Sequence, residues 1–377
     1  MAEHFHGAPR VAPMAVPPTT SNVRFGTTLL VAAVVMAAFL AADLALARMD
    51  VRESRVAAAA LYDQGRVLLV LGKASEAGDR FATALSMERG NLSYARALAQ
   101  AELQDGRAEE AGRTLQDVLN RAETDGAANL LMARVLVRQR RPADAKSYFH
   151  RAIYGKWGAD SVSRSVEARL ELIDLLATRH SESELLAELL PLEAMPNDSL
   201  APRRRLAHLF IEAGAPDRAS EIFRALLSDD PRDADAYAGL GEAALALGNF
   251  RAARADYAEA ARLLPRNARI VARAALADTV YAISPSVRGI GAVARDARSR
   301  ALLDAVSRRV DACAGTWRSA LSDSAHATLA RVAPKDGVGS ADAQASLAGD
   351  LWSARPAACR DAFNDDALTI VLRHMAQ

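Results

Sequence analysis

The strongest hydrophobic pattern in the chain lies between residues 234 and 267. Apolar side chains recur there at helical spacing, the pattern is interrupted at Gly248-Asn249, and Pro265 ends it. This predicts a helix over 236–247, a turn, and a second helix to 263. The periodic positions are Tyr237, Leu240, Ala244, Phe250, Ala253, Tyr257 and Ala260. Two helices this short cannot bury such a face alone, so the pair needs neighbours.

The same stretch, ADAYAGLGEAALALGNFRAARADYAEAARLLPRN, resembles a tetratricopeptide repeat. The resemblance rests on the aromatic-x-x-Leu-Gly opening at Tyr237–Gly241, the later Ala and aromatic positions, and the closing Pro265. The length of the stretch also matches the family's period of about 34 residues. The resemblance implies an all-α, right-handed solenoid of helix-turn-helix units. In this family the first helix of each unit lines a concave groove, where an extended peptide or a helix lies.

Stepping back by one period at a time finds further units in two registers. Residues 166–267 hold units four to six, and residues 58–159 hold units one to three in a second register. Six residues, DSVSRS at 160–165, separate the registers. Unit four lacks the turn glycine and the small Ala, so it is degenerate. The insertion is expected to lengthen the loop or helix between units three and four.

The N-terminal region predicts a membrane anchor. Residues 1–26 are rich in Pro, Ala and Thr and read as a disordered tail, whereas residues 27–47 form an apolar run long enough to cross a hydrocarbon core of roughly 30 Å. Two alternatives are a cleaved signal peptide, since Ala45-Leu46-Ala47 fits a cleavage site, and a buried soluble helix. We favour a retained single-pass anchor.

The orientation of this anchor rests on opposing indications. Two arginines precede the span and three follow it, which slightly opposes an N-terminus on the cytoplasmic side. A short tail, one span and a large domain is nevertheless the usual layout of a signal anchor. The Ala- and Arg-rich composition is typical of bacteria. We therefore expect the cell inner membrane, with the C-terminal domain in the periplasm.

Residues 268–377 read as several helices and are interpreted as a helical C-terminal cap, because the last repeat of a solenoid needs a covering element. This segment contains both cysteines, Cys313 and Cys359. In the periplasm they would form a disulfide; the alternative is two buried free thiols.

Composition and motifs exclude several functions. Net charge is +1 with 25 % charged residues, which gives no global case for nucleic-acid binding. The sequence has no His-Glu-x-x-His, Gly-x-Ser-x-Gly, P-loop or Cys-x-x-Cys motif. We therefore expect no catalytic residues, no metal and no cofactor.

The expected partner-binding groove follows from the family's groove-facing positions. Units one to three place basic and polar side chains there, and units four to six place mostly acidic ones, so a partner of complementary polarity would be oriented. The groove residues are Tyr62, Arg66, Arg96, Gln100, Arg134, Arg138, Arg204, His208, Glu212, Asp235 and Glu242. The alternative is that these are solvated helix faces.

The sequence thus predicts a membrane-anchored scaffold that binds a protein or peptide partner. Resemblance to bacterial members suggests assembly of an envelope system: polysaccharide export, secretion or cytochrome maturation. The rival hypothesis is an enzyme or enzyme subunit with its activity in residues 283–377, and self-association through the repeats also stays open.

Overall fold

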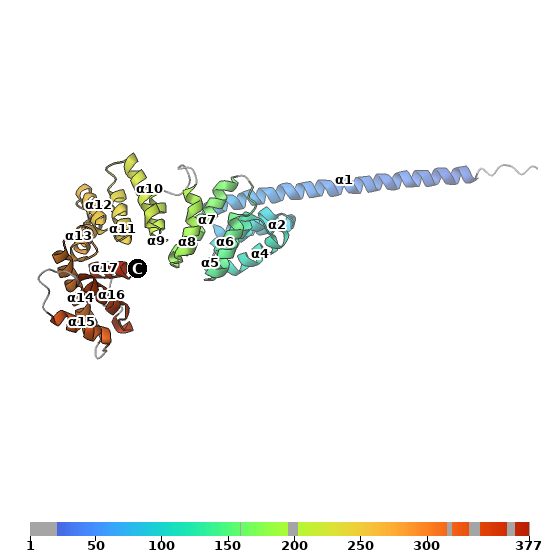
Figure 1. Cartoon of the computed structure of the whole chain (residues 1–377). Helices are drawn as coiled ribbons and strands as arrows, with labels where there is room; N and C mark the ends of the chain where they lie inside the picture. Colours follow the sequence, from blue (N-terminus) through green and yellow to red (C-terminus); the bar gives the residue numbers. More distant parts are fainter. Residues whose placement is uncertain are drawn as a thin grey trace, which may run out of the picture. The chain divides into compact units, whose positions relative to one another are not determined.

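The computed structural model describes residues 21–158, 160–194, 203–314, 319–331, 340–359 and 366–376, and helices dominate these residues (Figure 1). No β-strand occurs in the described part of the chain, where one isolated bridge joins Asp125 and Lys156. The predicted all-α class is confirmed. The chain forms two compact units. The N-terminal unit comprises residues up to Glu123 with Arg134–Arg141, and the C-terminal unit comprises Thr124–Ala133 with Pro142–Gln377.

The first helix, α1, is much longer than the sequence pattern predicted. It runs without a break from Ser21 to Val70, so it contains both the apolar run and the first helix of the first repeat (Figure 1). Residues 21–26, expected in the disordered tail, are helical; residues 1–20 lie outside the described residues. No Gly or Pro occurs between Gly26 and Gly65, so nothing in the sequence interrupts the helix.

By length and composition, Thr28–Val70 is able to cross a membrane, and its most apolar window has no buried residues. A signal sequence near the N-terminus fits the same description.

The other helices of the N-terminal unit form antiparallel hairpins on α1. They are α2 (Ala74–Met87), α3 (Leu92–Gln104), α4 (Ala108–Arg121) and the end of α5 (Gly126–Arg138). Their core begins where Phe81 and Ala77 of α2 pack against Ala97 and Ala101 of α3.

The C-terminal unit contains the start of α5 and the remaining helices. They are α6 (Pro142–Ile153), α7 (Ser161–Thr178), α8 (Glu182–Glu193), α9 (Arg203–Glu212), α10 (Pro216–Asp229), α11 (Ala234–Ala246), α12 (Phe250–Leu263), α13 (Ala268–Ile283), α14 (Ala292–Ala314), α15 (Ala320–Ala330), α16 (Ala341–Ser353), the 3₁₀ turn η1 (Ala357–Cys359) and α17 (Ala367–Met375).

A left-handed turn residue ends the first helix of every hairpin, and these residues mark the repeat. They are Gly72, Arg140 and His180, with φ of 75°, 59° and 53°, and the glycines Gly106, Gly214 and Gly248, with φ of 85°, 71° and 68°. A left-handed residue at this place lets the chain reverse after a helix. Along the chain, the spacing between one of these turn residues and the next equals the period of the sequence pattern. The spacing between Arg140 and His180 is the one exception in this set. The described residues therefore contain six hairpins, with one slip in register between the third and the fourth.

The extra residues between the third and fourth hairpins are accommodated at the start of α7. Asp160 has φ of 61°, and the next five residues form the first turns of α7. This helix is 18 residues long, whereas α6 and α8 have 12 each. The inserted residues therefore lengthen a helix.

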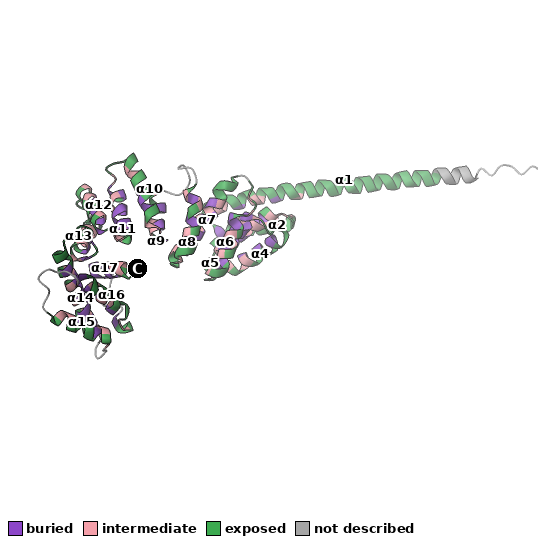
Figure 2. Cartoon of the chain, in the orientation of Figure 1, coloured by how far each residue is buried: buried purple, intermediate pink, exposed green. Residues whose placement is uncertain are grey.

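Each hairpin is closed by a small and a large residue in its second helix. The small position is fully buried at Ala77, Ala111, Ala145, Ala219 and Ala253, and Leu185 replaces it in the fourth hairpin. The large position, four residues later, is Phe81, Leu115, Phe149, Leu189, Phe223 and Tyr257. The large residue packs directly on the first helix at Gly239 and Gly241, where an added Cβ would lie 2.2 Å from the Phe223 ring and 2.6 Å from the Tyr257 ring. Buried positions accordingly line the helix faces that meet one another (Figure 2).

The helices after α13 share one core with the last repeat. Phe250 of α12 is buried in the same cluster as Val280 of α13, Leu303 of α14, Leu351 of α16 and Val371 of α17. The segment therefore covers the end of the repeat array, as a cap would.

Asp256 of α12 is expected to make stability pH-dependent. Burial raises the pKa of its carboxyl to about 6, against a smaller opposing effect of Arg224. Below about pH 4 the side chain is protonated in both folded and unfolded chains, and between about 4 and 6 the unfolded chain ionises first, so stability falls as pH rises. Asp256→Asn should remove this slope and raise the melting temperature at pH 7. Thermal unfolding of both proteins from about pH 3.5 to 7.5 measures it; parallel curves would contradict the expectation.

Candidate partner-binding groove

In the N-terminal unit, the predicted groove residues differ in how accessible they are. Tyr62 is half-buried, with its ring centroid 5.6 Å from that of Phe81 and 5.0 Å from that of Tyr94. It therefore packs in the hairpin core and is not an open contact residue. Arg66 is exposed and lies 3.8 Å from Asp63, so an acidic side chain accompanies it.

The other predicted residues of this unit lie on α3 and α5. Arg96 donates a hydrogen bond to the Ser93 hydroxyl (3.1 Å), and Gln100 is half-buried. Arg134 is half-buried and Arg138 is exposed. The basic character expected here therefore rests mainly on the exposed Arg66 and Arg138.

In the C-terminal unit, two predicted basic groups are paired with acids. Arg204 lies 2.6 Å from Asp233, and His208 Nδ1 lies 3.2 Å from Glu242. Asp233 also accepts a hydrogen bond from the Ala236 N–H as the N-cap of α11. Burial opposes ionisation of Asp233, but these hydrogen bonds outweigh it and keep its pKa below the ordinary value.

The ion pair between His208 and Glu242 favours the ionised form of Glu242. The hydrogen bond from His208 is the main cause that holds the pKa of Glu242 below its ordinary value. The His208 ring also packs edge-on against Phe223, with centroids 5.2 Å apart. Glu242 is therefore a partnered carboxylate. Of the predicted acidic groove residues, Glu212 and Asp235 are exposed and form no ion pair among the described residues.

Two cavities lie beside the predicted groove residues of the C-terminal unit. The larger has a volume of about 660 Å³, the smaller about 180 Å³, and Glu242, Tyr257 and Arg273 line both. Asp235 lines the smaller one. The first helices of the last two hairpins, α9 and α11, contribute to the walls, together with α13. Of the predicted groove residues, Arg204, His208, Asp235 and Glu242 line the smaller cavity, and Glu242 also lines the larger one.

The far wall of the larger cavity comes from α17, which sequence reasoning did not place there. Ile370, Arg373 and His374 line it. The His374 ring packs against Phe250 with centroids 5.5 Å apart, and an added Cβ at Gly248 would lie 2.0 Å from it. Helix α17 is not part of a repeat, so its position could not be predicted from the period of the sequence pattern.

The basic run Arg203-Arg204-Arg205 is neutralised by acids from three elements. Arg203 pairs with Asp229, Arg204 with Asp233, and Arg205 with Asp174. These contacts connect α9 to α10, α11 and α7. The run therefore ties neighbouring helices together.

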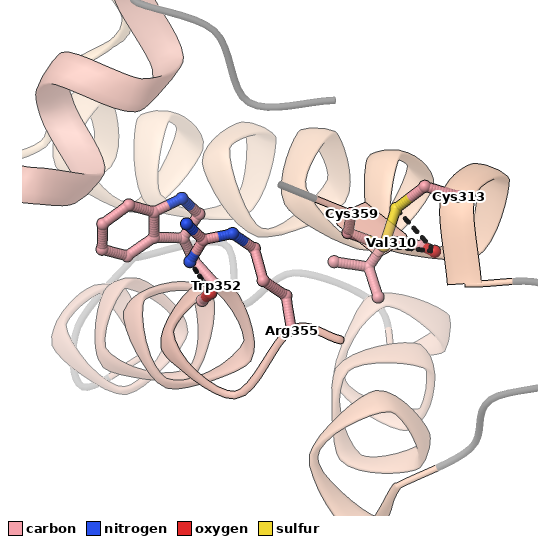
Figure 3. Close-up of a disulfide and its surroundings, with 5 residues drawn as sticks. All are labelled: Val310, Cys313, Trp352, Arg355 and Cys359. Carbon is pink, nitrogen blue, oxygen red and sulfur yellow. Dashed lines mark hydrogen bonds between the residues drawn. A yellow bond between two sulfur atoms is a disulfide. The ribbon is translucent and has the colours of Figure 1, made fainter. Parts of the chain in front are cut away.

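Cys313 and Cys359 form a disulfide in the structure, with 5.2 Å between their Cα atoms (Figure 3). Cys359 is fully buried. The bond joins the end of α14 to η1. Arg355 stacks over the Trp352 ring at 4.3 Å from the centroid (Figure 3). Trp317, the other tryptophan near these cysteines in sequence, lies outside the described residues.

Chemistry-bearing side chains do not cluster as a metal centre would require. No group of three His, Cys, Asp or Glu side chains is placed to hold a metal ion in the described ranges. In the C-terminal unit, the predicted groove residues instead lie beside two cavities lined by charged and apolar side chains.

Antiparallel hairpins that repeat every ~34 residues and line a face with their first helices define the class of α-solenoid interaction scaffolds. The family model for the tetratricopeptide repeat matches residues 62–128 and 204–269. These two stretches are tetratricopeptide repeats. Such repeats are in general non-catalytic protein-interaction scaffolds.

Solved structures of tetratricopeptide-repeat proteins are similar to this chain. One from Parabacteroides merdae is 21 % identical, with 59 % of this chain and 84 % of that chain covered and a TM-score of 0.34. The C-terminal part of a repeat-containing protein from Cytophaga hutchinsonii is 10 % identical, with 80 % and 99 % covered and a TM-score of 0.44. PilW, a type IV pilus biogenesis factor, is 20 % identical, with 57 % and 97 % covered and a TM-score of 0.40. Among curated proteins none matches.

Proposed function

We propose that this chain is a membrane-anchored scaffold that binds a protein partner along the first helices of its repeats. The observation that carries the proposal is the cavity of about 660 Å³ on the C-terminal unit, between α9, α11 and α13 on one side and α17 on the other. Apolar side chains such as Ile211, Leu245 and Ile370 line it beside charged ones. This mixture suits a peptide segment or a short helix.

Charge polarity would orient the partner. The N-terminal unit presents Arg66 and Arg138, and the C-terminal unit presents the exposed acids Glu212 and Asp235. A partner with basic side chains near the C-terminal unit and acidic ones near the N-terminal unit complements both. Such complementarity acts mainly on the association rate and on specificity.

The anchor is α1, inserted through residues 27–47 in the inner membrane of a bacterial cell, with the repeats in the periplasm. Two observations support this. The helix runs unbroken through Ala45-Leu46-Ala47, as a retained anchor would. The Cys313–Cys359 disulfide suits an oxidising compartment. The envelope system served is one that assembles from several proteins: polysaccharide export, secretion or cytochrome maturation.

The described residues of 283–377 favour a cap over a separate activity. Their large apolar side chains enter the core around Phe250, and α17 completes the groove wall. The segment therefore contributes to binding by shaping the groove.

The groove is tested by site-specific photo-crosslinking of the full chain in its native membranes. A photoreactive residue at Leu245 should capture a discrete partner. Glu212→Arg with Asp235→Arg should lower the captured yield about tenfold, because two attractive charges become repulsive. Glu221→Arg is the matched control: Glu221 is also exposed but belongs to the second helix α10, and it should leave capture unchanged.

Equal losses in the groove and control variants, or capture that is indifferent to both, would overturn the groove proposal. Mass spectrometry of the captured species then identifies the partner and the envelope system.

A further inference from the structure

Helix α1 has a second apolar face in addition to the one it packs into the N-terminal unit. Ala58 and Gly65 are buried against that unit. Val56 and Val67 are 71 % and 60 % exposed. Figure 2 shows α1 exposed along most of its length. A helix that is apolar on opposite sides requires a partner for each.

The exposed positions form one continuous stripe. Met49, Val56, Ala60 and Val67 follow one another in steps of seven, four and seven residues, the spacing that keeps side chains on one side of a helix. They are called the α1 stripe below. Asp63 lies at its edge and is accompanied by Arg66 of the same helix at 3.8 Å.

The lipid of a membrane cannot cover the α1 stripe. At 1.5 Å per residue, Val56 lies about 14 Å and Val67 about 30 Å beyond residue 47, where the predicted span ends. Inside a repeat array, the outer face of a first helix is covered by the hairpin before it. Here the residues before the first hairpin are the rest of α1 itself, so no preceding hairpin is available among the described residues.

We infer that the α1 stripe is covered by the α1 stripe of a second copy of this chain, in a parallel two-fold dimer. This rests on the proposed membrane anchor. Because the stripe and the span belong to one uninterrupted helix, two anchored copies are parallel and place the same residue at the same height. A two-fold axis then brings each stripe against itself.

Charges at the edges of the stripe fit the same arrangement. Arg52 and Glu53 lie on opposite edges, both are exposed, and neither has an ion-pair partner within the described ranges. In a parallel helix pair, one edge of each helix faces the opposite edge of its partner. Arg52 of one copy therefore faces Glu53 of the other, close to the membrane.

Cysteine crosslinking of the full chain in membranes tests the dimer. Both native cysteines are in the disulfide, so a single introduced cysteine is the reactive one. Val56→Cys and Val67→Cys should each give a dimer with a short bifunctional maleimide. Ser75→Cys is the control, since Ser75 is exposed on α2 of the same unit, and its yield should be at least fivefold lower.

A second variant ties the crosslink to the apolar stripe. With Ala60→Cys as reporter, Val67→Arg should lower the dimer yield at least tenfold while circular dichroism stays unchanged. Equal yields from stripe and control cysteines, or a yield insensitive to Val67→Arg, would overturn the inference. Carbonate extraction separates the two proposals: release of the chain refutes the anchor, whereas a retained chain without crosslinks refutes the dimer alone.

Discussion

Glu188→Gln is expected to lower the unfolding free energy of the C-terminal unit by about 3–5 kcal/mol. Glu188 of α8 and Arg169 of α7 are both 7 % exposed, and they form a hydrogen-bonded ion pair. His150 of α6 places Nδ1 3.6 Å from the same carboxylate. The substitution keeps the volume and removes the charge. The Arg169 guanidinium then stays buried without its carboxylate, which is the costly state.

Urea unfolding of the full chain in detergent, followed by circular dichroism, measures the loss. Glu184→Gln is the matched control: it removes the charge of another glutamate of α8, which pairs with Lys146 of α6, but that pair is exposed. Its cost should stay below about 1 kcal/mol. The double variant Arg169→Met with Glu188→Leu should recover most of the stability, because no charge is left buried. Equal costs for the buried and exposed pairs would contradict the argument.

The repeat itself could be predicted from sequence because each constraint on it is local. A left-handed turn, a small residue and a large residue recur at fixed offsets, and each leaves a recognisable residue type. This signal is weak in the sequence of the fourth hairpin. His180 takes the turn conformation usually given to Gly, and Leu185 takes the small position. Tertiary packing tolerates both, so the fold persists where the motif fades.

The groove could be predicted only in outline. The period predicts which positions face a groove, and four of these positions line the smaller cavity of the C-terminal unit. It does not tell which of those side chains pair with one another. Arg204 and His208 are held by Asp233 and Glu242, and Tyr62 is held by Phe81 and Tyr94. Such pairings depend on distances between helices that the sequence leaves unspecified.

The continuation of α1 beyond the apolar run and the position of α17 could not be predicted, for related reasons. An apolar run marks a membrane span, but its end does not mark the end of a helix, since Ala and Arg continue it readily. The α17 segment is amphipathic, which predicts a helix but not its neighbour. Helix α17 lines the cavity because its apolar side chains pack into the core around Phe250.

Replacing both cysteines with Ala should destabilise the C-terminal unit by about 4 kcal/mol on the chain-entropy model, because the bond closes a loop between residues 46 apart. The bond holds η1 to the end of α14, and the segment after η1 leads to α17. Its loss should therefore also weaken the groove wall. We expect a lower urea midpoint and a lower crosslinking yield at Leu245.

Reduction provides the matched control for this double variant. Dithiothreitol should lower the urea midpoint of the wild-type chain to that of Cys313→Ala with Cys359→Ala, and it should leave the double variant unchanged. Crosslinking through Val56→Cys on α1 should persist in the double variant, because the N-terminal unit has its own core. A wild-type midpoint that does not respond to reduction would show that the α14–η1 packing holds this region without the bond.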